Sequence, residues 1–186
     1  MWGMETTTAR SNTFLQRLIG AAALDAAIYE EVESDRGATG QAMAIVVLSS
    51  IAAGIGARGF GSSVGSIAFF GVVALLTWAT WALVMFELGG RVMPEPETRT
   101  NPGELLRTLG FAATPGLASL LGAVPGVTTR VFVLVWIWML MAMVVAVRQA
   151  LDYRSTAKAV AVCLLGGILA AAIALVLGIF LGPTVS

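Results

Sequence analysis

The stretch that decides the fold lies between two long apolar runs and reads Glu87-Leu-Gly-Gly-Arg-Val-Met-Pro-Glu-Pro-Glu-Thr-Arg-Thr-Asn-Pro-Gly-Glu-Leu-Leu-Arg107-Thr-Leu-Gly-Phe-Ala-Ala-Thr-Pro115-Gly116. A connector rich in Pro and Gly leads into a weakly apolar segment that contains Arg107. Proline inside a helix removes a backbone hydrogen bond and clashes with the preceding turn. We therefore expect a helix over residues 104–124 that is kinked or split at Pro115 and Gly116. It should be buried among other helices, because lipid cannot satisfy freed backbone groups.

The chain as a whole is too apolar for a soluble domain. Of its 186 residues, 58% are hydrophobic and 12% are charged, against about 25% charged in ordinary soluble domains. The sequence has no histidine and a single cysteine, Cys163. The commonest general base and metal ligand is therefore missing, and we expect no enzymatic activity, no metal site and no cofactor. A net charge of zero without a basic tract argues against a nucleic-acid partner.

Five apolar segments predict an all-α, polytopic protein whose first partner is the lipid bilayer. The membrane domain spans residues 41–182, with helices expected at 41–57, 64–88, 104–124, 131–151 and 159–181. With five spans, Arg58 and Arg130 fall on one side of the membrane and the other basic residues on the opposite side. We expect the inner (cytoplasmic) membrane, and the positive-inside rule then places the N-terminus in the cytoplasm and the C-terminus on the outer side.

Residues 1–40 are predicted to form a cytoplasmic tail and one amphipathic helix. Over residues 11–33, a broad apolar stripe that includes Phe14 and Tyr29 lies opposite Arg17 and Glu31 on a helical wheel. Ser11 or Asn12 could cap the start of this helix. We expect the helix to lie in the membrane interface because it is too charged to cross. The alternative is an ordinary surface helix.

Four ionisable residues are predicted at the cytoplasmic edge of the bundle, where such groups are costly unless they are paired. They are Glu87, Arg107, Arg148 and Asp152. We expect Glu87 to pair with Arg107 or Arg148, and Asp152 to pair with Arg148. Two interpretations remain open: a salt-bridged latch that fixes the order of the helices, or a site for an ion, a proton or a lipid headgroup.

A second charged group is acidic and precedes the first span: Glu30, Glu31, Glu33 and Asp35. Hard cations require several oxygen ligands, but these residues lack the spacing of a calcium loop. A solvated acidic face is the simpler interpretation. The same end could instead pair with basic residues of the loops, namely Arg91, Arg99, Arg154 or Lys158.

Small residues recur at every fourth position of the last span: Gly166, Ala170, Ala174, Gly178 and Gly182. A ladder of this kind forms a smooth face on which another helix can approach closely. The face could serve packing within the chain or the seam of a homodimer.

Several short motifs together resemble the bacterial branch of the Yip-domain family of Ypt/Rab-interacting membrane proteins. They are Leu88-Gly-Gly90, Glu104-Leu-Leu-Arg-Thr-Leu-Gly-Phe-Ala112, Pro115-Gly116, Tyr29-Glu-Glu-Val-Glu33 with Ala38-Thr-Gly-Gln-Ala42, and Val145-Ala-Val-Arg-Gln-Ala-Leu-Asp-Tyr153. The resemblance covers residues 14–181 and implies five membrane helices with a cytoplasmic N-terminus. Eukaryotic relatives are associated with small prenylated GTPases and with membrane shape. The acidic-aromatic Gly-Pro motif of that branch is replaced here by Glu87-Leu-Gly-Gly.

Two functions follow as hypotheses. The first is a non-enzymatic membrane-organising or partner-binding module that acts through its cytoplasmic face. The second is a small oligomeric transporter or ion channel that uses the four charged residues beside the broken third span, as many transporters do.

Overall fold

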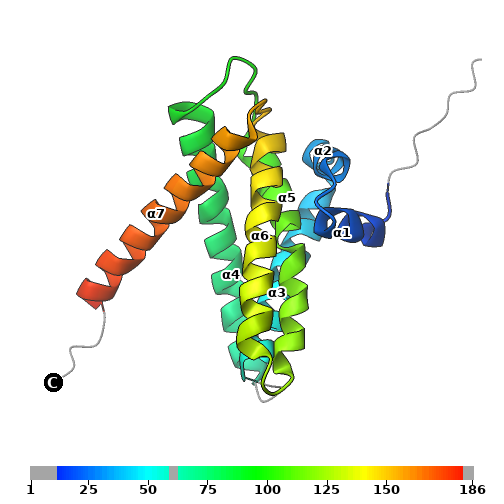
Figure 1. Cartoon of the computed structure of the whole chain (residues 1–186), viewed down its shortest axis with the longest axis vertical. Helices are drawn as coiled ribbons and strands as arrows, with labels where there is room; N and C mark the ends of the chain where they lie inside the picture. Colours follow the sequence, from blue (N-terminus) through cyan, green and yellow to red (C-terminus); the bar gives the residue numbers. More distant parts are fainter. Residues whose placement is uncertain (1–11, 59–62, 182–186) are drawn as a thin grey trace, which may run out of the picture.

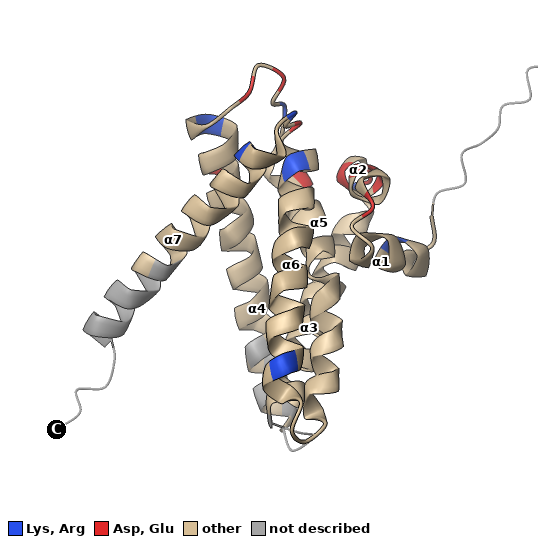
Figure 2. Ribbon diagram, viewed as in Figure 1, with Lys and Arg blue, Asp and Glu red and all other residues tan. Residues whose placement is uncertain are grey.

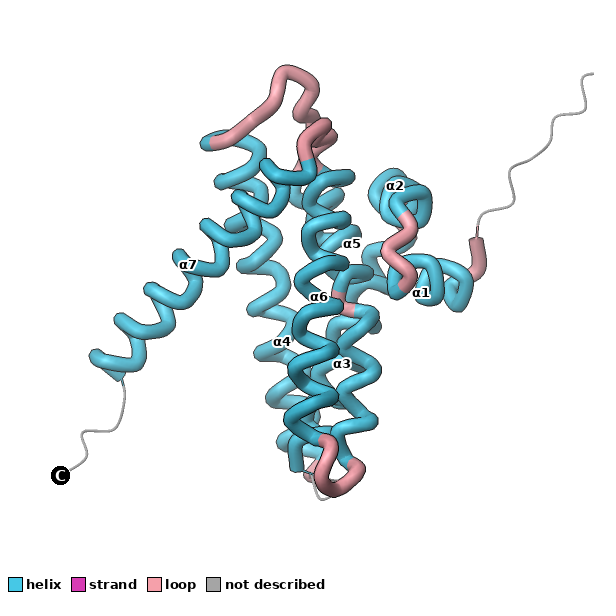
Figure 3. The backbone as a smooth tube through the Cα atoms, in the orientation of Figure 1, coloured by secondary structure: helices cyan, strands magenta, loops and turns pink. Residues whose placement is uncertain are grey.

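The computed structural model describes residues 12–58 and 63–181, and across these residues its regular structure is helical, with no β-strand. The helices are α1 (Phe14–Ala22), α2 (Ala26–Ser34), α3 (Ala38–Arg58), α4 (Val64–Met85), the π-helix η1 (Phe86–Val92), α5 (Pro102–Ala112), the 3₁₀ helix η2 (Thr114–Ala123), α6 (Thr128–Ala150) and α7 (Thr156–Leu181). Figure 1 shows α3, α4 and α6 running along one bundle, with α1 and α2 beside it and α7 leaving it at an angle. The connections lie mainly at the ends of the bundle (Figure 3).

Three helices are long and apolar enough to cross a membrane: Ala38–Ala57, Gly71–Val92 and Thr128–Ala150. They correspond to α3, to most of α4 with η1, and to α6. The first part of α7, Thr156–Ala170, is a shorter apolar stretch. The chain is therefore a helical membrane protein, as its composition predicts.

The predicted break at Pro115 is present. Helix α5 ends at Ala112, and the 3₁₀ helix η2 takes over from Thr114. In a continuous α-helix the carbonyl of Phe111 would accept from residue 115, where proline has no N–H. The Thr114 hydroxyl donates to that carbonyl instead, at 2.7 Å, and Ser49 Oγ of α3 donates to the Ala113 carbonyl at 2.8 Å.

Helix α5 and the start of η2 are buried, as predicted, whereas Leu120 and Leu121 near the end of η2 are exposed. The side chains of Leu105, Phe111 and Pro115 are among the most fully enclosed in the described chain. Helix η2 packs mainly against α3 and α6, and α5 packs against α2, α3, α4 and α6. At the break, a neighbouring helix donates to the Ala113 carbonyl, a bond that lipid could not supply.

The prediction of one N-terminal helix is wrong, because the chain turns at Leu24. Leu24 has a left-handed backbone (φ 64), and Asp25 caps α2 by accepting from the Ala27 N–H at 3.0 Å. The resulting hairpin closes when the Tyr29 hydroxyl donates to the Ala21 carbonyl at 3.1 Å. The cap of α1 is Thr13, in a capping box with Gln16, rather than Asn12; Ser11 lies outside the described residues.

Candidate functional site

Many of the described charged residues gather at one end of the bundle, and others lie on α1 and α2 beside it (Figure 2). Arg130 is in the first turn of α6, at the other end of that helix from Arg148. The charged end of the bundle includes the four residues predicted to pair with one another. The expected pairing of Glu87 with Arg107 or Arg148 is wrong. Glu87 instead pairs with Arg91 at 2.8 Å, one helical turn along the chain, and both side chains are more than half exposed. Arg91, on the next turn of the same helix, lies closer to Glu87 than any arginine of another helix does.

Arg107, although buried, binds backbone carbonyls rather than a carboxylate. Its Nε lies 3.0 Å from the carbonyl oxygens of both Val32 and Glu33, and its Nη2 also donates to the Glu33 carbonyl. These carbonyls belong to the last turn of α2, where no helical N–H remains to bond them. A cation there also complements the negative end of the helix dipole. Arg107 therefore anchors α2 to α5.

Arg17 is the second buried cation, and it holds the α1–α2 hairpin together. It forms ion pairs with Glu31 and Asp35, each at 2.8 Å, and its Nη1 donates to Gln41 of α3 at 3.2 Å. Hydrogen bonds and charge from Arg17 lower the pKa of Asp35. Burial opposes the lowering of the Glu31 pKa, which hydrogen bonds from Asn12 and Arg17 and the charge of Arg17 bring about. The sequence placed Arg17 on a solvent face, so its role was missed.

The acidic cluster is thereby divided. Glu31 and Asp35 face Arg17, whereas Glu30 and Glu33 face the end of α6. They border a polar hollow of about 180 Å³ lined by Glu30, Glu33, Ser34, Arg148, Gln149, Asp152 and Tyr153. Burial raises the pKa of Glu33 to about 7, helped by the negative charges of Asp152, Glu104 and Glu30 and opposed by Arg107.

The predicted pair of Arg148 with Asp152 is also wrong, although both residues border the same hollow. Arg148 Nε donates to the Tyr153 carbonyl at 3.3 Å, and Asp152 accepts from the Arg99 backbone N–H at 3.4 Å. Asp152 adopts a left-handed backbone (φ 51) where the chain turns out of α6. That turn removes the one-turn helical spacing on which the predicted pair depends.

Arg154 and Lys158 bind the connector before α5, not the acidic end of α2 as one prediction allowed. Arg154 forms an ion pair with Glu97. Lys158 Nζ donates to the Pro94 carbonyl at 2.8 Å and lies 3.9 Å from Glu95. The connector is thus tied to the turn between α6 and α7.

Tyr153 fixes the π-helix at the end of α4. Its hydroxyl lies 2.8 Å from the carbonyl oxygens of both Gly89 and Met93, and its one proton is shared between them. A side chain at Gly89 would overlap Leu151 Cδ1. Glycine therefore lets this widened turn press against the α6–α7 turn.

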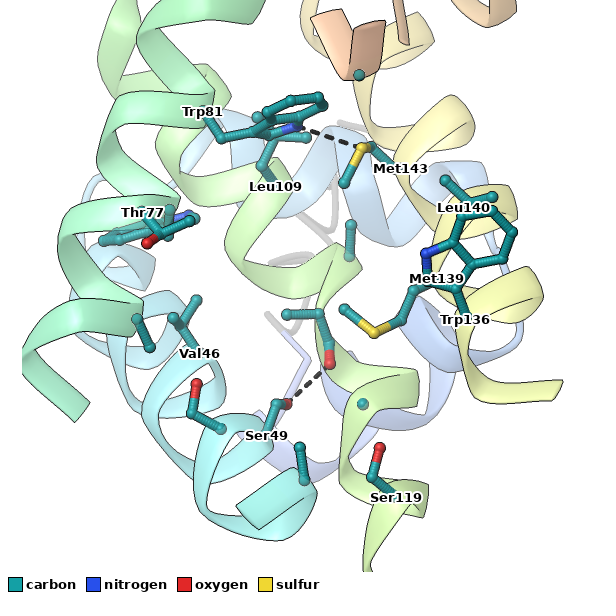
Figure 4. Close-up of a pocket in the computed structure, with 18 of the residues that line it drawn as sticks. Val46, Ser49, Thr77, Trp81, Leu109, Ser119, Trp136, Met139, Leu140 and Met143 are labelled. Atoms are coloured by element: carbon teal, nitrogen blue, oxygen red, sulfur yellow. Dashed lines mark hydrogen bonds between the residues drawn. The ribbon is translucent and has the colours of Figure 1, made fainter. Parts of the chain in front are cut away.

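An apolar cavity of about 590 Å³ lies inside the bundle (Figure 4). Helices α4 and α6 form its two side walls, while α3, α5 and η2 form its floor. The first half of α7 covers it at Cys163 and Gly167. Its walls carry the indoles of Trp78, Trp81 and Trp136, and no charged residue lines it.

The predicted small-residue face of α7 is used within the chain at its first position. A side chain at Gly166 would overlap Met85 Cε of α4. Ala170 is exposed. Ala174 and Gly178 lie where the structure describes no side chains, and Gly182 lies outside the described residues.

Within the part of the chain that the structure describes, no group of three or more His, Cys, Asp or Glu side chains could hold a metal ion. Sequence reasoning missed the cavity and the roles of Arg17, Ser49 and Tyr153. Each depends on contacts between residues far apart in sequence, for which no local spacing is a signal. No family model matches the chain, and no curated protein or solved structure matches it either.

Proposed function

We propose that this chain is a non-enzymatic protein of the inner membrane that binds a protein partner through its charged end, which faces the cytoplasm. The three apolar helices, together with the split α5–η2 segment and α7, would supply five spans. The concentration of basic residues at this end supports the orientation. The same helix order is what membership of the bacterial Yip-domain branch would require.

The α1–α2 hairpin supports a role at the membrane surface. Helix α1 exposes Leu15 and Ile19 by 65% and 63%, with Phe14 beside them, while Arg17 is turned inward. In Figure 1, α1 lies across the direction of the bundle. An exposed apolar edge on such a helix suits insertion into the headgroup layer.

The observation that carries the proposal is the polar hollow beside α2. Its two sides are α2 and the end of α6, and Arg107 holds α2 in place by donating to the Glu33 carbonyl. Glu30 and Asp152 at its rim are exposed. A rigid concave surface with exposed charges can bind a side chain of complementary charge at low entropic cost. A partner that inserts a Lys or Arg fits it.

Site-specific photo-crosslinking tests this proposal. A photoreactive residue at Ser34 or Gln149, on the rim of the hollow, is expected to give one discrete protein adduct in native membranes. The same residue at Thr129, at the opposite end, is the control and should give none. Glu30→Gln combined with Asp152→Asn should remove the adduct. Only lipid adducts at Ser34 and Gln149, or an adduct indifferent to both substitutions, would refute partner binding here.

The transport hypothesis receives less support from the geometry. Glu87 and Arg91 pair at the surface, and Arg107 donates its hydrogen bonds to backbone carbonyls. No charged side chain lines the cavity inside the bundle. Ion flux through liposomes containing the purified protein, abolished by Arg107→Ala without loss of folded protein, would replace our proposal with a channel or transporter.

A further inference from the structure

The large apolar cavity lies at the depth of the bilayer. Three of the helices that line it, α3, α4 and α6, are those that are long and apolar enough to cross a membrane. The medium around it is therefore hydrocarbon, not water. An empty hole of this size would forfeit the dispersion contacts of every atom that lines it.

The cavity has a side opening toward lipid. Gly167 of α7 covers one end of it, but beyond this point α7 leaves the bundle, and the face between α4 and α6 has no helix over it (Figure 1). Trp136 stands at this opening with 64% of its surface exposed. Trp136 also borders a second hollow of about 510 Å³, toward the Thr128 end of α6. One elongated molecule could thus occupy both.

The walls offer little to a polar ligand. The indole N–H of Trp78 donates to the Leu106 carbonyl at 3.0 Å, and that of Trp81 faces Met143 Sδ at 3.2 Å. The hydroxyls of Ser49 and Thr77 donate to backbone carbonyls, each at 2.8 Å. These four donors are used within the protein, which leaves Ser50, Ser119 and the indole of Trp136 as the other polar side chains of the lining. Bound water needs two to four polar partners, roughly, so an apolar occupant suits this space better than water does.

We propose that this cavity binds one acyl chain of a membrane lipid, which enters from the bilayer between α4 and α6 past Trp136. The chain of the same lipid continues through the second hollow toward the Thr128 end. The volume of about 590 Å³ falls within the range of about 300–1,000 Å³ that small-molecule sites occupy. This site is independent of partner binding at the charged end.

Two glycines allow a matched test. A side chain built on Gly167 meets no atom within 4 Å, and Gly167 lines the cavity. Gly54 of α3 is equally unobstructed but does not line the cavity. Gly167→Phe should therefore fill the site without disturbing the fold, and Gly54→Phe is its control.

The full chain is reconstituted in phosphatidylethanolamine and phosphatidylglycerol vesicles with a trace of a phospholipid that carries a diazirine in its acyl chain. After irradiation, mass spectrometry maps the labelled residues. We expect labels on Met139 and Met143, inside the cavity, in the native chain and in Gly54→Phe, and loss of these labels in Gly167→Phe. Labels on the exposed Leu164 and Ile168 should persist in all three.

Native mass spectrometry supplies a second measurement. The native chain should retain one phospholipid under conditions that strip lipid from Gly167→Phe. Cavity residues labelled no more than in Gly167→Phe would overturn the proposal. So would a dimer whose cavity residues are unlabelled, because a second copy of the chain would then cover the opening.

Discussion

The guanidinium of Arg107 donates to the backbone carbonyl of Glu33, 74 residues earlier in the chain, at 3.0 Å. An arginine that sequence pattern assigned to a salt bridge thus serves as the C-terminal cap of a helix. The free energy it contributes is that of charge-assisted hydrogen bonds in a buried site.

Arg107→Ala should lower the free energy of unfolding by about 2–3 kcal/mol, because carbonyls at the end of α2 lose their donor. Glu87→Ala should cost less than about 1 kcal/mol, since its pair with Arg91 is exposed. Denaturant unfolding in detergent micelles measures both. The double variant should show the sum of the two losses. An interaction energy between the two substitutions above about 1 kcal/mol would instead support the salt-bridged latch that the sequence predicts.

Deprotonation of Glu33 should weaken the docking of α2 as the pH rises. Its pKa of about 7 lies above the ordinary value of 4.5, so the folded state favours the protonated form. Stability should be greatest on the acid side of this window and fall between about pH 5 and pH 8, by on the order of 1–2 kcal/mol. Hydrogen exchange of the α2 amides as a function of pH checks this.

Glu33→Gln should flatten that dependence, whereas the control Glu97→Gln, at the exposed connector, should leave it in place. Glu31 and Asp35 act in the opposite direction because their pKa values are lowered. Their contribution is present above their unfolded pKa values and is lost as the pH falls below about 4. An unchanged slope in Glu33→Gln between pH 5 and pH 8 would assign the effect to another group.

Gly56→Ala should destabilise the protein by about 1–3 kcal/mol, as overpacking does. A methyl group there would overlap the Ser119 carbonyl of η2. Gly54→Ala, on the same helix, meets no atom within 4 Å and should be neutral or stabilising by up to about 1 kcal/mol. Thermal unfolding of the two variants, measured side by side, tests this prediction. Equal melting temperatures would mean that α3 and η2 do not pack this closely.

Tyr153→Phe keeps the shape of a buried side chain but removes the donor to the carbonyls of Gly89 and Met93. We expect a loss of about 1–3 kcal/mol and faster hydrogen exchange over residues 86–93. Tyr29→Phe removes a comparable buried bond to Ala21 and should affect exchange only in α1 and α2. Faster exchange over residues 86–93 in both variants would indicate general loosening rather than a local role of Tyr153.

The elements that the sequence predicts well are those with local causes. Apolar length marks α3, α4 and α6, and Pro115 marks the break between α5 and η2. The turn at Leu24 was missed because the 3.6-residue apolar period continues across it, while the Asp25 cap competes with the helix at that point. Alanine and leucine favour helix on both sides, so propensity alone gives no warning.

The candidate site could be predicted less well, because its partners depend on how helices pack. Charge pattern located Glu87, Arg107, Arg148 and Asp152 near one end of the molecule but not their contacts. Arg17 was assigned to solvent from the wheel, yet it is 3% exposed, since Glu31 and Asp35 of the next helix reach it. No wheel of a single helix contains that information.

The contacts that hold the α1–α2 hairpin in place determine when it can dock during synthesis of the protein. The indole of Trp138 donates to the Ala22 carbonyl across 116 residues of sequence. At about 5–20 residues per second, the ribosome needs on the order of ten seconds to pass from one to the other. Helices α1 and α2 are therefore translated before α6 and cannot dock in their final position until α6 has been made.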